Sequence, residues 1–193
     1  MLEVDLTLTE FHAAVSVGMQ RLIESSALKL NAHNVGVSRT WMERLGDEVR
    51  GALGEIAWAK ARNQFFCGSC GTFHHEPDVQ GVEIRSMRRP NDSLIVRSND
   101  VPERPFVLSH ATGEKVKFFG WIYAKDGMRD EFKKAPRGGN EAWFIPQRAL
   151  NDFSKFPNEE GGGHAYSNAL QRAVGKQNQG ERHGDRPKED KAW

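Results

Sequence analysis

The sequence has few cysteines, and it lacks a membrane-spanning stretch and a secretory signal, the features that would place a protein outside the cytoplasm or in a membrane. It has only two cysteines among 193 residues, Cys67 and Cys70, which are too few for a disulfide framework. No apolar run is long enough to span a membrane, and the first residues lack the basic start and apolar stretch of a secretory signal. We therefore expect a cytoplasmic protein that has no membrane partner.

The chain also lacks an excess of charge of either sign. Lys and Arg total 27 and Asp and Glu total 26, so the net charge is close to zero. This balance argues against a strongly basic protein that coats DNA without specificity, although a local basic groove would still hold phosphates. The mean hydropathy of −0.65 indicates a segment too polar to join a core. We assign it to residues 157–193, expected to be a largely disordered tail.

Two long helices are predicted in the first third of the chain. Thr7 and Glu10 form a capping-box pattern, and apolar residues follow at helical spacing towards an expected end near Leu30 and Asn31. A second helix is expected from about Ser38 to Asn63. The first helix, within residues 1–35, would pack on a core domain formed by residues 36–156.

The middle of the chain alternates between short β-branched or apolar stretches and Gly, Pro, Asn or Asp. Strands are predicted near Thr72–His75, Gly81–Met87, Leu94–Arg97, Phe106–His110, Lys117–Ala124 and Trp143–Ile145. Turns are predicted at Pro90–Asp92 and Thr112–Glu114, and short helices from Pro146 to Leu150 and from His164 to Val174. This order predicts an α/β (α+β) fold with a mixed β-sheet flanked by helices.

Two carboxylates are expected side by side near the middle of the chain. Glu83 and Arg85 are two residues apart in a predicted strand, so their side chains leave one face while Ile84 points into the core. Asp78 is five residues before Glu83 and would lie on the opposite face of a regular strand. A bend at Gln80–Gly81 would bring its carboxylate back to Glu83.

Adjacent carboxylates favour a metal site, because they raise each other's proton affinity unless a cation lies between them. Mg²⁺ prefers oxygen ligands and takes one or two carboxylates together with phosphate oxygens. Asp78 and Glu83 are therefore candidate ligands for Mg²⁺ or Mn²⁺. Arg85 would add a fixed positive charge that can donate two hydrogen bonds to a phosphate.

Glu55 is a third candidate because of its neighbours on the second predicted helix. The residues three or four positions away are Gly51, Ala52, Trp58 and Ala59, of which three are small. A carboxylate on such a face can lie close against a sheet, whereas a glutamate exposed on the helix surface is the alternative.

Taken together, Gly51–Glu55, Pro77–Asp78 and Glu83–Arg85 resemble the PD-(D/E)XK nuclease superfamily. That superfamily includes restriction endonucleases, phage exonucleases and Holliday-junction resolvases. Its core is a mixed sheet flanked by helices, with a helix-borne Glu, a strand-borne Asp and an E-x-K on the next strand. The stretch from Ser38 to Leu150 also resembles small proteins of actinobacterial phages and prophages.

The resemblance makes Glu55, Asp78 and Glu83 the metal-site carboxylates and places Arg85 where the family has lysine, so these four are the candidate catalytic residues. It implies a restriction-endonuclease-like core and a Mg²⁺-dependent deoxyribonuclease of phage or mobile-element biology in a bacterial host cell. Arginine cannot be deprotonated, so Arg85 would stabilise a phosphate but could not transfer a proton.

Three further arginines, Arg88, Arg89 and Arg97, are close to this segment in sequence and are candidate contacts to the phosphate backbone of DNA. For each of them, a plain solvated surface residue is the alternative. The sequence leaves the oligomeric state open, with a homodimer among the options.

Two other functions compete with a nuclease. A DNA-binding or phage-assembly module on the same fold would explain arginine at position 85 as a sign of lost metal chemistry. A zinc-stabilised interaction domain would use Cys67, Cys70 and His74 or His75. Its ligand spacing is tight, because only three residues separate Cys70 from His74, so free thiols in a loop are preferred.

Overall fold

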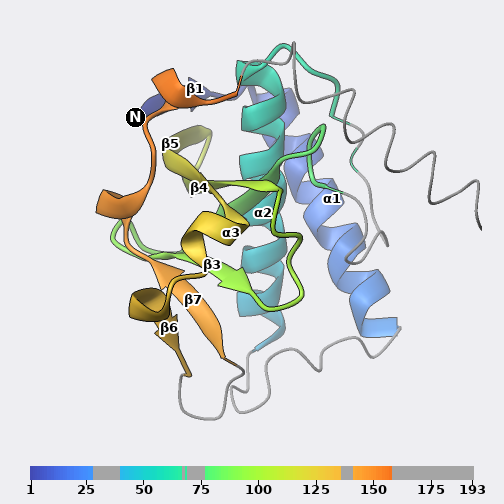
Figure 1. Ribbon diagram of the computed structural model, residues 1–193. Helices are drawn as coiled ribbons and strands as arrows, with labels where there is room; N and C mark the ends of the chain where they lie inside the picture. Colours follow the sequence, from blue (N-terminus) through green and yellow to red (C-terminus); the bar gives the residue numbers. More distant parts are fainter. Residues whose placement is uncertain (28–39, 67, 69–76, 136–140, 158–193) are drawn as a thin grey trace, which may run out of the picture. The chain divides into compact units, whose positions relative to one another are not determined.

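The computed structural model describes residues 1–27, 40–66, 68, 77–135 and 141–157 (Figure 1). Contacts between Cα atoms divide the chain into one compact unit that ends at Phe156 and another that begins at Pro157. The predicted strand Thr72–His75 and the predicted helix His164–Val174 lie outside the described residues. Within the described ranges, no helix has both the length and the apolar composition needed to cross a bilayer.

Two antiparallel helices form one layer of the first unit. They are α1 (Leu8–Ala27) and α2 (Trp41–Ala61). Each begins with a capping box, Thr7 with Glu10 and Thr40 with Glu43, which satisfies backbone N–H groups of the first turn. Both predicted helices are confirmed. The end expected for the first, near Leu30, lies outside the described residues.

The central layer is a four-stranded mixed sheet in the order β1-β5-β4-β2. Its strands are β1 (Leu2–Asp5), β5 (Lys115–Tyr123), β4 (Pro105–Thr112) and β2 (Glu83–Ser86). β2 pairs with β4 in parallel, and the other two pairings are antiparallel. β4 and β5 meet at the predicted turn around Gly113, whose φ of 61° suits glycine. β2 is an edge strand, so one side of it is not covered by a neighbouring strand of this sheet.

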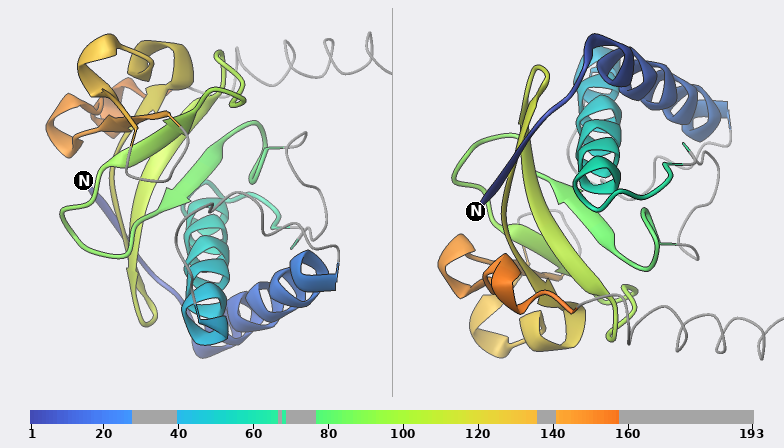
Figure 2. Two further views of the ribbon diagram at one scale, coloured as in Figure 1. Left: turned by 90° about the horizontal axis from the view of Figure 1, so that it is seen from below. Right: turned by 90° about the horizontal axis from the view of Figure 1, so that it is seen from above.

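A second sheet forms the third layer, in the order β3-β7-β6. Its strands are β3 (Leu94–Arg97), β7 (Ala142–Ile145) and β6 (Lys133–Lys134). One core cluster joins α2 to one face of the central sheet through Ile84 and Val107. The other joins the opposite face, through Phe106, to the second sheet. The central sheet therefore lies between the helices and the second sheet (Figure 2).

This architecture confirms the predicted α/β (α+β) class, with a mixed sheet and packed helices. The short helix predicted from Pro146 is the single 3₁₀ turn η3 (Gln147–Ala149). Three other short turns were not predicted: α3 (Ala124–Gly127), η2 (Asp130–Phe132) and η4 (Phe153–Lys155). Strands β1 and β6 were also missed.

Candidate functional site

A tight turn brings Asp78 back towards β2. Two backbone hydrogen bonds close this turn: the N–H of Val82 donates to the oxygen of Val79 at 2.9 Å, and the N–H of Val79 donates to the oxygen of Val82 at 3.2 Å. Gln80 and Gly81 adopt φ values of 40° and 88°, a left-handed conformation that glycine accepts readily. The bend predicted at these two residues is confirmed. As a result, Oδ2 of Asp78 accepts a hydrogen bond of 2.7 Å from the backbone N–H of Ile84.

Strand β2 carries Glu83 and Arg85 on one face and the core residue Ile84 on the other, as predicted. Nη2 of Arg85 lies 3.6 Å from Oε2 of Glu83, and its guanidinium lies over the Phe106 ring at 5.0 Å from the centroid. Glu83 is buried, with 8% of its surface exposed. Its charge must therefore be balanced by neighbours.

Glu55 is a buried helix residue, with 3% of its surface exposed, so the alternative of an exposed glutamate is wrong. The adjacent Gly54 lets α2 approach the sheet, because a methyl group there would lie 2.6 Å from Oγ of Ser86. Arg21 on α1 donates to both carboxylate oxygens of Glu55, at 2.6 and 2.7 Å. This bidentate geometry is the strong form of a charged hydrogen bond.

The charges on β2 are balanced by the segment between β3 and β4. Nη1 of the buried Arg104 donates to Oε1 of Glu83. Nη2 of Arg85 donates to Oδ1 of Asp100 at 3.0 Å, while the backbone N–H of Arg97 donates to the other oxygen of Asp100 at 2.8 Å. Nε of Arg85 is buried and has no hydrogen-bond partner among the described residues, so this side chain keeps one unsatisfied donor.

The three candidate carboxylates lie within electrostatic reach of one another. Burial, followed by the charges of Glu55 and Glu83, raises the pKa of Asp78 to about 7, while the Ile84 hydrogen bond and Arg85 act in the opposite direction. Asp78 is thus the meeting point of a helix residue, a turn residue and a strand residue. A bound cation would relieve the repulsion that the two glutamates exert on Asp78.

The donor set fits a hard divalent cation in chemical type, because all three side chains offer carboxylate oxygens. No group of three His, Cys, Asp or Glu among the described residues is arranged to hold a metal ion as the side chains stand. Mg²⁺ does not require three protein ligands, since it commonly keeps several waters and takes one or two carboxylates. Asp78 with either glutamate would meet that requirement.

The three arginines predicted to contact phosphate, Arg88, Arg89 and Arg97, differ in their neighbours. The guanidinium of Arg88 is held by both carboxylate oxygens of Asp47 on α2. The side chain of Arg89 is exposed. Arg97, the last residue of β3, is also exposed. Contact of these arginines with DNA stays a prediction, and Cys67, Cys70, His74 and His75 of the zinc alternative lie outside the described residues.

Sequence reasoning missed the partners of the carboxylates, namely Arg21, Arg104 and Asp100. Arg21 is 34 positions from Glu55, and Arg104 is 21 positions from Glu83. One signal was available for Arg21: it lies one helical turn after Gly18, a small residue that allows close helix contact. No comparable local pattern marks Arg104.

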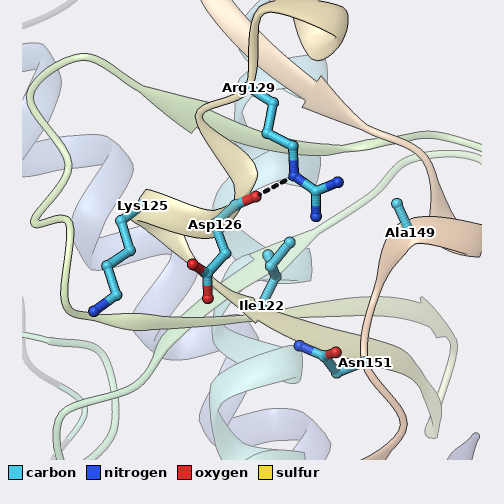
Figure 3. Close-up of a pocket in the computed structure, with 6 residues that line it drawn as sticks. All are labelled: Ile122, Lys125, Asp126, Arg129, Ala149 and Asn151. Carbon is cyan, nitrogen blue, oxygen red and sulfur yellow. Dashed lines mark hydrogen bonds between the residues drawn. The ribbon is translucent and has the colours of Figure 1, made fainter.

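A surface pocket of about 410 Å³ lies apart from these residues. It is lined by Ile122, Lys125, Asp126, Arg129, Ala149 and Asn151 (Figure 3). Nε of Arg129 is held by the backbone oxygen of Asp126 at 2.9 Å. None of the predicted site residues lines this pocket, so it is not part of the candidate site.

Comparison of the chain with protein families, with curated proteins and with solved structures found no match.

Proposed function

We propose that this protein is a metal-dependent nuclease of PD-(D/E)XK type that hydrolyses DNA phosphodiester bonds in phage or mobile-element biology. One observation carries the proposal: Glu55, Asp78 and Glu83 come from three separate elements, yet both glutamates raise the pKa of Asp78. Carboxylates that repel one another in a partly buried place are costly without a counter-charge. A divalent cation with phosphate ligands suits that arrangement.

Each side chain has a role in this function. Asp78 and Glu83 would hold Mg²⁺ or Mn²⁺, with Glu55 completing the set. The bound cation supplies Lewis-acid chemistry, which stabilises charge on a phosphate and makes water a better nucleophile. Arg85 is permanently charged and lies beside Glu83, so its charge can stabilise the phosphate in the transition state. Arg85 cannot act as a base.

A nuclease assay on linear, circular and branched DNA, with Mg²⁺ or Mn²⁺, tests this function. We expect cutting by the wild type and a loss of at least about a hundredfold in Asp78→Asn and Glu83→Gln, the scale expected when transition-state stabilisation is removed. The matched control is Glu141→Gln, whose exposed carboxylate pairs with Lys133 at 2.8 Å. Equal cutting by Asp78→Asn and the control would rule out the assigned site.

A second candidate is a DNA-binding or phage-assembly module without catalytic activity. The observation that favours it is that Glu55 and Glu83 are already neutralised by Arg21 and Arg104. The charges are then balanced by the protein itself. In that case we expect DNA binding in EDTA, no cutting of any substrate, and no rise in melting temperature on addition of Mg²⁺. Metal-dependent stabilisation would instead favour the nuclease.

A further inference from the structure

Arg21 reaches the candidate site from a helix outside it. Its guanidinium covers both carboxylate oxygens of Glu55, and the side chains are only 17% and 4% exposed. Removing either partner of such a shielded ion pair is costly, because it leaves a buried charge without compensation. A divalent cation can therefore use Glu55 only if Arg21 gives way.

A second carboxylate is available to Arg21 on the same helix. Glu48 precedes Glu55 by seven residues, which is two helical turns, so both side chains lie on one face of α2. Glu48 is half-buried and forms no hydrogen bond or ion pair with the described residues. Burial raises the pKa of Glu48, and the charge of Arg21 lowers it. Arg21 therefore acts electrostatically on Glu48 as well as on Glu55.

The alignment of the helices places Glu48 beside the Arg21 backbone. A methyl group on Gly18 would lie 2.7 Å from the backbone N of Val49, and Nη2 of Arg44 donates to Oγ of Ser26 at 3.2 Å. Arg21 lies between Gly18 and Ser26, so its backbone faces the part of α2 between Arg44 and Val49, which contains Glu48. A transfer of the guanidinium from Glu55 to Glu48 would therefore proceed by rotation about the side-chain bonds of Arg21.

We propose that Arg21 is a movable counter-ion, which a divalent cation displaces from Glu55 and which Glu48 then receives. The inference rests on the proposed function, because it requires a cation at the carboxylates. Arg21 is a positioning residue in this scheme and touches neither DNA nor the reacting atoms. Glu48 lowers the free energy of cation entry, since the displaced guanidinium finds another carboxylate.

Isothermal titration with Mn²⁺, on the full chain without DNA, tests the inference through affinity. Arg21→Gln removes a competing positive charge, so we expect Mn²⁺ to bind about tenfold more tightly than to the wild type. Glu48→Gln removes the receiving carboxylate and should weaken binding by about threefold to tenfold. In the double variant, Glu48→Gln should have little further effect, because no guanidinium remains to be received.

The double variant distinguishes transfer of the Arg21 guanidinium to Glu48 from a general effect of the negative charge of Glu48 on Mn²⁺ binding. An equal loss of affinity on Glu48→Gln with and without Arg21 would overturn the inference, as would unchanged Mn²⁺ affinity in Arg21→Gln. Absence of Mn²⁺ binding in both the wild type and Arg21→Gln would remove the proposed metal site as well. If Mn²⁺ binds to the wild type and Arg21→Gln leaves its affinity unchanged, the inference about Arg21 fails but the proposed metal site stands.

Arg21→Gln leaves Glu55 buried without its ion pair and can lower stability, so thermal unfolding of each variant is measured first. Arg21→Lys is the second variant, because lysine keeps the charge but lacks the planar pair of donors. We expect its Mn²⁺ affinity to lie between those of the wild type and Arg21→Gln. Affinity no greater than that of the wild type would contradict the competition.

Discussion

At the scale of single residues, the balance of charge around Asp78 sets the chemistry of the site. Its carboxylate accepts one backbone hydrogen bond, from Ile84, while two buried glutamates lie within electrostatic reach. Arginines neutralise Glu55 and Glu83 directly, but Asp78 has no comparably short ion pair among the described residues. Asp78 is therefore the carboxylate at which an added cation would have the largest effect.

The raised pKa of Asp78 predicts how stability depends on pH in EDTA. The folded protein keeps this proton up to a pKa of about 7, whereas the unfolded chain releases it near the ordinary value of 3.8. The stabilising contribution is thus complete below about pH 4 and is lost as the pH rises through 7. Asn cannot lose a proton and still accepts the Ile84 hydrogen bond, so Asp78→Asn should not show this loss.

Urea unfolding at pH 5 and pH 8 measures the effect. We expect the wild type to lose at least about 1 kcal/mol more than Asp78→Asn between these two pH values. Asp126→Asn, at an exposed carboxylate, should follow the wild type. Parallel pH profiles for the wild type and Asp78→Asn would show that Asp78 titrates in its ordinary range.

Local patterns predicted the four candidate site residues but not what surrounds them. The two-residue alternation placed Glu83 and Arg85 on one face, and the glycine at position 81 indicated the bend after Asp78. Glu55 was indicated by small neighbours on a helix. The pairs with Arg21 and Arg104 join segments that are distant in the chain, and their geometry depends on how the layers pack.

At the scale of elements, the contact between α2 and the central sheet fixes where Glu55 lies relative to β2. Gly54 is a point of close approach, facing the hydroxyl groups of Ser86 and Ser109, which lie 2.7 Å apart. A methyl group would lie 2.6 and 2.7 Å from these oxygens and 3.0 Å from Cγ2 of Ile84. The space between the helix and the sheet is therefore already filled.

Gly54→Ala should destabilise the protein by about 1–3 kcal/mol, as is typical when a packed core is overfilled. This is the opposite of the usual gain of up to about 1 kcal/mol when alanine replaces glycine within a helix. Gly46→Ala is the matched control on the same helix. A methyl group there meets only the flexible end of Arg50, at 3.3 Å.

Denaturant unfolding compares the two alanine variants. We expect Gly46→Ala to be as stable as the wild type or more stable. Equal stability of Gly54→Ala and Gly46→Ala would mean that α2 can move away from β2 at little cost. In that event Glu55 would not be held in a fixed position.

Long elements could be predicted from the sequence because their signals are local. A capping box indicated the start of the first helix, and the β3 bounds match the prediction, Leu94–Arg97. Strands β1 and β6 were missed: β6 has only two residues, both exposed, and β1 has a single buried residue, Val4. Their strand conformation depends on β5 and β7, with which they pair.

At the scale of the whole molecule, the central sheet is buried on both faces by different partners. Adjacent residues of β4 point into different clusters: Val107 faces the helices and Phe106 faces the second sheet. The two core clusters are thus joined through β4, which contributes residues to both. We expect the first unit to unfold as one cooperative structure.

Ile145→Ala, in the second sheet, tests whether the first unit unfolds cooperatively. Ile145 is fully buried in the cluster away from the helices, so its truncation should cost about 2–5 kcal/mol. Hydrogen exchange read by mass spectrometry should show reduced protection in α2 as well as in β7, by a similar free energy. Loss of protection in β7 alone would mean that the second sheet opens independently.

The pairing of β1 with β5 has a consequence for the order in which the chain folds during synthesis. Asp5 pairs with Lys115, so this edge of the sheet cannot close until most of the first unit has been translated. The helix pair is local by comparison, and contacts between nearby segments form fastest. The Arg21–Glu55 pair can therefore form on a nascent chain, whereas Glu83 must await its neighbour Phe106 on β4. A chain still on the ribosome before that point has its counter-ion in place but no assembled carboxylate cluster.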